Sequence, residues 1–153
     1  MILGVFMDNL ELKTENELKE LTSIVLFHGT SGEIMNSILS EGVLPWNKCK
    51  GHNWDNGFDF FGIFVPKMDH VYFASFDAAK NYAMHVVDHN AGGKAIIIEA
   101  ELNTSKLGPD EDSRKETWYQ SFLSANVCSH KGKVSVEQIR RIYDCNGNII
   151  YPK

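Results

Sequence analysis

The stretches LFHGTS at residues 26–31 and HVYFAS at residues 70–75 decide how this chain is expected to fold. Each contains apolar residues typical of a β-strand and closes on a hydroxyl residue that favours the start of a helix. The first stretch carries His28 and then the small Gly29, which lets a ligand approach the backbone closely. The second carries Tyr72. We therefore expect two neighbouring strand ends to present an imidazole and a phenol, a pair suited to hydrogen bonding and stacking on a nucleotide.

A helix is predicted after each of these two strands. Thr30 opens the capping-box pattern Thr-Ser-Gly-Glu, which predicts a helix over residues 31–41 that ends at Gly42. Ser75 predicts a second helix over residues 75–87, with an apolar stripe rich in alanine. Both strands are thus expected to lead directly into helices, which places their polar ends at helix starts.

The rest of the chain is predicted to be richer in strands than in helices. The isoleucine-rich run at residues 95–102 follows a glycine pair and is a strong strand signal. Further expected elements are a helix at 14–22, a strand at 23–27, a long loop at 43–69 with a short strand at 62–65, an acidic loop at 107–113, and strands at 122–128, 134–136, 139–144 and 148–151. Early helices and late strands without an internal repeat predict the α+β class.

Composition predicts one soluble domain spanning residues 1–153. The chain has 153 residues, of which 43% are hydrophobic. It contains no apolar run near the ~18 residues that a membrane span needs. We therefore expect no membrane association and a cytoplasmic location. The net charge of −5 argues against loose, salt-driven binding to nucleic acid, which needs a basic surface.

Neither a metal site nor a disulfide framework is expected. The three cysteines are widely spaced and form no Cys-x-x-Cys unit. His85 and His89 stand four residues apart on a predicted helix, a spacing that suits one metal ion. No third ligand is placed beside them, so an exposed pair is the favoured interpretation.

Three motifs, in their order along the chain, resemble the ADP-ribosyltransferase superfamily. They are HGT at residues 28–30, VYFAS at residues 71–75 with its alanine-rich helix, and GKAIIIE at residues 93–99. The resemblance is to the branch with a His and Tyr pair, which includes poly(ADP-ribose) polymerases, RNA 2′-phosphotransferases and small rifampicin-inactivating enzymes. It covers about residues 24–143. It implies an α+β fold of split, bent antiparallel sheets, with NAD bound as a substrate in the cleft between them.

The resemblance also implies roles for single residues. His28 would hydrogen-bond a ribose of NAD, the backbone of Gly29 would meet the carboxamide, and Tyr72 would stack on the nicotinamide ring. The remaining residues of the implied NAD-binding set are Thr30, Phe73, Ala74 and Ser75.

The third catalytic position of the family is an acidic residue, less often Gln, near the bond that breaks. A carboxylate beside a developing cation stabilises it electrostatically. In the rifampicin-inactivating branch this acid lies in an acidic loop after the isoleucine-rich strand, which here favours Asp112, then Glu111, with Asp110 in the same triplet. In the polymerase branch it opens a later strand, where only Gln120 could serve.

The sequence therefore predicts a mono-ADP-ribosyltransferase that cleaves the nicotinamide glycosidic bond of NAD and passes ADP-ribose to an acceptor. A protein, a nucleic acid, a small molecule and water all stay open as acceptors, as does the oligomeric state. A phage or bacterial effector would suit a domain of this size. Two alternatives remain: a non-catalytic NAD or ADP-ribose binding module, and an RNA 2′-phosphotransferase, against which the acidic charge balance speaks.

Overall fold

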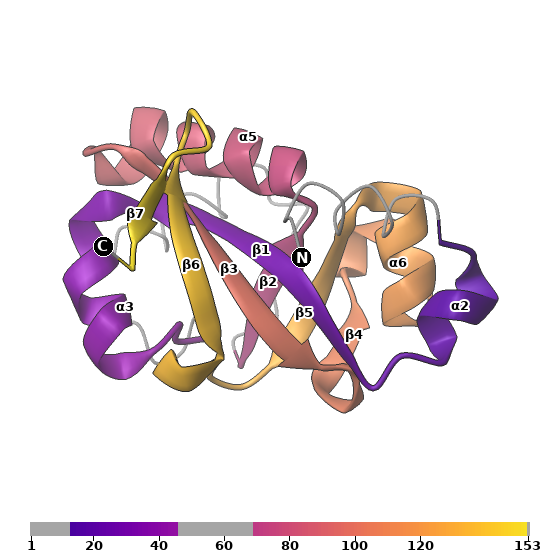
Figure 1. Ribbon diagram of the computed structural model, residues 1–153. Helices are drawn as coiled ribbons and strands as arrows, with labels where there is room; N and C mark the ends of the chain where they lie inside the picture. The colour runs from indigo at the N-terminus through magenta and orange to yellow at the C-terminus, as the bar shows by residue number, and fades with distance from the viewer. Residues whose placement is uncertain (1–12, 46–68, 153) are drawn as a thin grey trace.

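A seven-stranded antiparallel sheet organises residues 13–45 and 69–152, the part of the chain that the computed structural model describes (Figure 1). The strand order is β4-β5-β2-β1-β3-β6-β7. The strands are β1 (Ser23–Ser31), β2 (His70–Ala74), β3 (Ala95–Asn103), β4 (Leu107–Pro109), β5 (Val127–Lys131), β6 (Ile139–Asp144) and β7 (Ile149–Tyr151). The helices are α2 (Glu15–Lys19), α3 (Met35–Glu41), α5 (Phe76–Val86) and α6 (Trp118–Ala125), with short turns η1 (Gly32–Ile34), η3 (Val87–Ala91), η4 (Thr104–Lys106), η5 (Glu111–Ser113) and η6 (Val136–Gln138).

The sheet is divided between β1 and β2. β1 pairs with β3 along its whole length, whereas it pairs with β2 at a single position, Phe27 opposite Ala74. β2 continues the sheet on its other side, where all five of its residues pair with β5. The α+β class with split antiparallel sheets is therefore confirmed. From His28 onward, β1 has no paired residue on β2.

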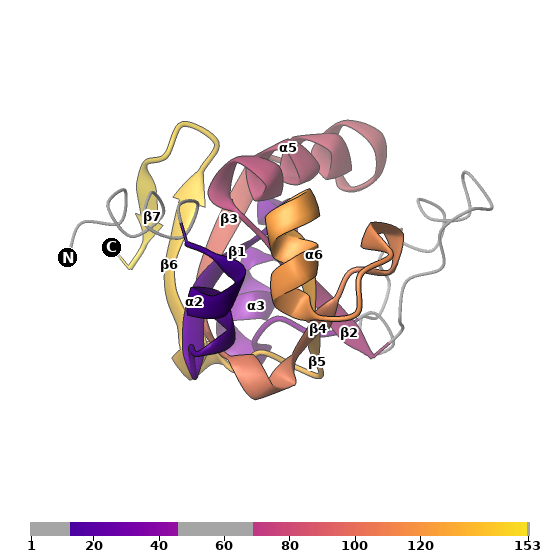
Figure 2. The ribbon, with the colours of Figure 1, turned by 90° about the vertical axis from the view of Figure 1, so that its right-hand side faces the viewer.

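Two groups of apolar side chains cover the two faces of the sheet. Even-numbered residues of β1 such as Leu26 join a large cluster with side chains from α2, α3 and α6. Phe27 faces the other way and joins a smaller cluster with Ala79 of α5. Figure 1 shows α5 across the top of the sheet, with α3 on the left and α6 beside α2 on the right. The quarter turn of Figure 2 keeps α5 at the top and α6 next to α2.

Gly29 is the point where α5 meets β1. A Cβ atom added at Gly29 would lie 1.9 Å from the carbonyl oxygen of Ala79, a distance that no side chain tolerates. The sequence suggested that this glycine admits a ligand to the backbone. In the structure its missing side chain admits the backbone of α5.

Capping patterns in the sequence predicted three helix ends correctly. At a fourth, the predicted cap is one residue too early. Thr14 forms the predicted capping box with Glu17, Ser75 caps α5, and α3 ends at Gly42, whose φ is +87°. Thr30, in contrast, belongs to β1, and the hydroxyl of Ser31 takes the capping role by accepting the backbone N–H of Glu33 at 3.1 Å. The predicted helix over 31–41 begins as the 3₁₀ turn η1 before α3.

The strand predicted at 122–128 is wrong, because most of it is helix α6. Thr117 caps this helix, and the apolar residues Trp118 and Phe122 lie four apart on its buried face. Asn126 ends the helix in the left-handed conformation at φ 61°, and β5 starts one residue later. Apolar content without a count of its period therefore misled the assignment.

Two smaller expectations also changed, and a third cannot be compared. The acidic loop expected at 107–113 begins instead with strand β4, which pairs with β5. The strand expected at 134–136 is reduced to one bridge, between Val134 and Val43, followed by η6. The strand expected at 62–65 and most of the loop at 43–69 lie outside the described residues. Among the described helices, none has the length and apolar character needed to cross a membrane.

Candidate functional site

Tyr72 contacts His28 and Glu111, two other residues that the sequence proposed for the site. Its backbone carbonyl accepts a hydrogen bond from Nδ1 of His28 at 2.8 Å. Its phenol hydroxyl donates to Oε2 of Glu111 at 2.7 Å. A strand residue of β2 thus joins β1 on one side and the turn η5 on the other, and it brings together three positions spread over 83 residues of the chain.

The hydrogen bond from His28 determines which of its ring nitrogens remains available. Burial lowers the pKa of the His28 imidazole below its usual value of 6.5, so the ring is neutral at neutral pH. A neutral imidazole has one N–H donor and one acceptor nitrogen. Because Nδ1 donates to the Tyr72 carbonyl, Nε2 carries the lone pair. His28 therefore presents an acceptor, suited to a ligand hydroxyl.

The phenol of Tyr72 reaches Glu111 across two neighbouring strands. Tyr72 lies opposite Ser129 of β5, and Ser129 lies opposite Gly108 of β4. Residues directly opposite one another share a face of the sheet, so this row runs from a phenol over two small residues. This row of Tyr72, Ser129 and Gly108 ends on β4, the strand that leads into η5.

The His28 ring and the Tyr72 ring are linked through the backbone, not through ring contact. The imidazole lies beside Phe73, with ring centroids 5.6 Å apart. Neighbouring residues of a strand point to opposite faces, so the Tyr72 phenol leaves β2 on the side away from Phe73 and therefore also away from the His28 ring. Phe73 itself is fully buried in the large apolar cluster, so its side chain serves packing.

Within the acidic triplet the structure distinguishes the three carboxylates. Glu111 meets Tyr72, while Asp112, which the sequence favoured first, is exposed. Asp110 is buried, with 9% of its surface exposed. That burial, followed by the charges of Glu111 and Asp112, raises the pKa of the Asp110 carboxyl to about 6. The triplet therefore offers one carboxylate to the site, one to solvent and one to the interior.

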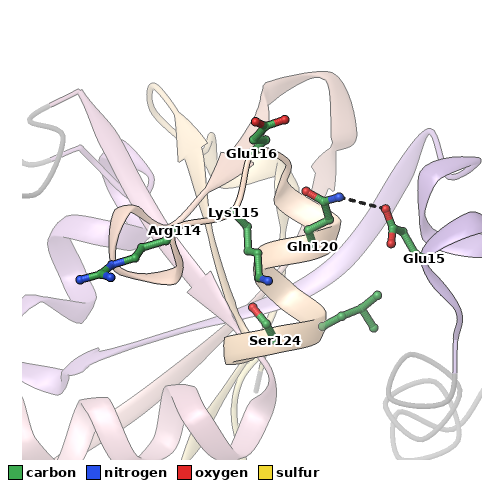
Figure 3. A pocket seen from close by; sticks show the side chains of 7 residues that line it. Glu15, Arg114, Lys115, Glu116, Gln120 and Ser124 are labelled. Carbon is green, nitrogen blue, oxygen red and sulfur yellow. Dashed lines mark hydrogen bonds between the residues drawn. The ribbon is translucent and has the colours of Figure 1, made fainter.

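Gln120, the other candidate for the third position, lies apart from these residues. It is on α6, and its side-chain amide donates to Oε1 of Glu15 on α2 at 3.1 Å (Figure 3). It lines a surface hollow of about 480 Å³ that none of the His28, Tyr72 and Glu111 side chains enters. Arg114 and Lys115, from the segment that leads into α6, also line this hollow (Figure 3). The structure thus groups Glu111, not Gln120, with Tyr72.

The remaining predicted binding residues divide into two groups. The hydroxyl of Thr30 is buried and finds no hydrogen-bond partner among the residues that the structure describes, and Thr30 shares a strand face with His28 two residues away. Ser75 is occupied in capping α5, where its hydroxyl accepts the N–H of Ala78 at 3.4 Å. Ala74 is buried and pairs with Phe27 of β1.

The residues described by the structure contain no group of three or more His, Cys, Asp or Glu side chains placed to hold a metal ion. The His85 and His89 rings stack on each other at the exposed end of α5, with centroids 4.1 Å apart, and Nδ1 of His89 donates to the His85 carbonyl.

Sequence reasoning missed the serines that surround the acidic triplet. Ser121 on α6 and Ser129 on β5 are completely buried, and both bond to the backbone just before Glu111. Nothing in the sequence distinguishes a serine that will be buried from one that will be exposed. Only the pairing of β4 with β5 could have pointed to them.

No family model matches the chain, and no curated protein matches it. Among solved structures, a chain named EcPltA aligns over 82% of this chain and 80% of its own, at 12% identity and a TM-score of 0.49. A mutant of E. coli heat-labile enterotoxin aligns over 82% and 72%, at 16% identity and a TM-score of 0.47. Likeness at this level concerns the arrangement of strands and helices and is not specific to the branch with the His and Tyr pair.

Proposed function

We propose that this protein binds NAD where β1 and β2 part, with His28 and Thr30 on one face and Tyr72 and Glu111 on the other, and transfers its ADP-ribose to an acceptor. The observation that carries the proposal is the position of Tyr72, bonded through its carbonyl to His28 and through its hydroxyl to Glu111. The resemblance of the HGT and VYFAS motifs to ADP-ribosyltransferases supports the same assignment.

The polar groups present suit the sugar hydroxyls of a dinucleotide. Nε2 of His28 is an acceptor, and the Thr30 hydroxyl is a buried donor with no partner within residues 13–45 and 69–152. Glu111 adds a carboxylate acceptor, and Tyr72 orients it. A pair of neighbouring ribose hydroxyls can both donate and accept, so donor and acceptor groups on one strand face match it.

The proposed reaction breaks the bond between C1′ of the ribose and the nicotinamide nitrogen. Nicotinamide leaves with the bonding electrons as a neutral molecule, and positive charge develops on the ribose. The Glu111 carboxylate stabilises this charge. The acceptor nucleophile then bonds to C1′ and releases its proton to a base. We assign this role to the Glu111 carboxylate. Tyr72 contributes by holding Glu111 in one orientation before the charge appears.

Release of nicotinamide from labelled NAD tests this proposal. Glu111→Gln keeps the size of the side chain and removes its charge, and we expect it to lower the rate by about 100-fold or more. Asp112→Asn is the matched control, because it removes one charge from the same turn at an exposed position, and we expect a change of less than about threefold.

The outcomes separate the alternatives. Equal effects of the two substitutions would remove Glu111 from its role, and a larger effect of Asp112→Asn would transfer the role to Asp112. Calorimetric binding of NAD by the wild-type protein, without nicotinamide release in the presence of protein, nucleic-acid or water acceptors, would replace the transferase with a binding module. Absence of NAD binding would overturn both.

A further inference from the structure

Three serine hydroxyls form hydrogen bonds with three consecutive polar groups of the backbone just before Glu111. Ser129 of β5 donates to the carbonyl of Pro109 at 2.9 Å. Ser121 of α6 accepts the N–H of Asp110 at 3.0 Å. Ser113 donates to the carbonyl of Asp110 at 2.6 Å. We refer to Ser113, Ser121 and Ser129 as the serine clamp. It binds both polar groups of the peptide that joins β4 to η5, and the carbonyl that follows.

Ser121 is the member of the serine clamp that connects separate elements. Its side chain is completely buried, and besides accepting from Asp110 it donates to the carbonyl of Val127 at 2.6 Å. One hydroxyl therefore joins α6, the first residue of β5 and the start of η5. Both its donor and an acceptor position are used, so no rotation of the hydroxyl can replace one bond without losing the other.

The hydrogen bonds of Ser121 involve the two segments that hold the proposed site together. Ser121 accepts the N–H of Asp110, the residue just before Glu111. Ser121 also bonds to the first residue of β5, the strand that pairs with β2 and lies opposite Tyr72. The Tyr72 to Glu111 hydrogen bond needs β2 and η5 to be placed relative to each other within a few tenths of an ångström. Through buried hydrogen bonds, Ser121 therefore links η5, which carries Glu111, to β5, which pairs with the strand that carries Tyr72.

We propose that Ser121 is a positioning residue for Glu111, acting by fixing the β4–η5 peptide relative to β5 and hence to Tyr72. This inference rests on the proposed function for its kinetic consequence, whereas its geometric consequence is independent of NAD. Removal of the hydroxyl leaves the Asp110 N–H and the Val127 carbonyl to find other partners in a buried region, and η5 shifts as a result.

The kinetic test compares Ser121→Ala with Ser124→Ala. Ser124 is on the same helix, and in the described part of the chain its hydroxyl bonds to the Ser121 carbonyl alone, at 3.3 Å. We expect Ser121→Ala to lower kcat between about ten- and 100-fold with little change in KM, and Ser124→Ala to leave both nearly unchanged. In a Glu111→Gln background the effect of Ser121→Ala should vanish, because the carboxylate that it positions is already absent. An equal loss in both backgrounds would show a general structural role and overturn the proposal.

The second readout needs no turnover. The ¹³Cζ resonance of the Tyr72 ring reports the hydrogen bond at its hydroxyl, and it should move in Ser121→Ala and in Glu111→Gln but not in Ser124→Ala. An unmoved signal in folded Ser121→Ala would overturn the positioning role, whether or not the protein turns over NAD. If Ser121→Ala does not fold, Ser121→Cys replaces it, since a thiol of similar size is a weak donor and acceptor, and the same shift is expected.

Discussion

The Tyr72 hydroxyl donates a 2.7 Å hydrogen bond to the Glu111 carboxylate, which lies 39 residues further along the chain. The same geometry occurs elsewhere in the fold, where the Tyr143 hydroxyl donates to Oε1 of the buried Glu99 at 2.7 Å. Two pairs of the same chemistry therefore differ in location: one lies at the proposed site, and the other joins β6 to β3. The second pair provides a control for the first.

Tyr72→Phe keeps the aromatic ring and removes only the hydroxyl. We expect kcat for nicotinamide release to fall about tenfold, because Glu111 loses the partner that orients it, while KM for NAD changes less than about twofold. Tyr72→Ala, which also removes the ring, should raise KM as well. Tyr143→Phe deletes the same kind of bond away from the site and should leave kcat unaltered. Parallel losses in Tyr72→Phe and Tyr143→Phe would indicate a common effect on folding.

The neutral state of His28 predicts an acid limit to NAD binding. Burial lowers the pKa of its imidazole in the folded protein below 6.5, so as the pH falls the unfolded chain takes up the proton first. The stability that this group contributes is present above about pH 6.5 and is lost as the pH falls through the lower folded-state pKa. We expect NAD affinity to be constant from about pH 7 to 8 and to weaken only at a pH below the ordinary histidine value of 6.5, once Nε2 is protonated. Titration of the His28 ring by ¹⁵N NMR measures this directly, and a midpoint at or above 6.5 would contradict it.

Asp110 should give the opposite dependence of stability on pH. Its pKa is raised from 3.8 to about 6, so the folded state holds the proton more tightly, and stability falls as the pH rises through this interval. Asp110→Asn removes the buried charge and retains an oxygen acceptor. We expect it to increase the free energy of unfolding by about 1–2 kcal/mol at pH 7.5 and to change it by less than about 0.5 kcal/mol at pH 4. Urea unfolding of both proteins at the two pH values tests the prediction, with the exposed Asp112→Asn as a control. A gain that is the same at both pH values would show that ionisation is not its cause.

Gly29→Ala should be strongly destabilising, by more than about 3 kcal/mol, because its Cβ would overlap the Ala79 carbonyl and push α5 away from β1. Gly108→Ala is the comparison, since an added Cβ there would be 3.4 Å from the Ser129 hydroxyl, an ordinary contact. We expect a change of less than about 1 kcal/mol for Gly108→Ala. Thermal or urea unfolding measures both, and a mild effect of Gly29→Ala would mean that α5 does not pack closely on β1.

Much of the local structure could be predicted because it depends on neighbours in the sequence. Thr14, Ser75 and Gly42 cap helices through bonds within a few residues, and their patterns identified the helix ends. The isoleucine run of β3 and the strand of β6 were likewise evident, since β-branched residues favour an extended chain. His28 and Tyr72 were expected on neighbouring strand ends, and the His28 ring does bond to the Tyr72 backbone, but the Tyr72 phenol points to the other face.

The choice among the three acidic residues could not be made in this way. Asp110, Glu111 and Asp112 open or form a 3₁₀ turn, in which successive side chains point about 120° apart. A shift of one position therefore moves a carboxylate from the interior to the site or to solvent. The sequence favoured Asp112, whereas Glu111 is the one that meets Tyr72.

By itself, the sequence determined the class of fold, the two strands that carry His28 and Tyr72, and the acidic segment that supplies a carboxylate, because these follow from short-range pattern and residue chemistry. Only the tertiary structure decided that Glu111 is the carboxylate bonded to Tyr72, that Gly29 accommodates α5, and that buried serines hold the turn η5. These depend on the register of β2, β5 and β4 and on the packing of α5 against β1. Such contacts join residues distant in the chain, and their geometry is set by the whole sheet.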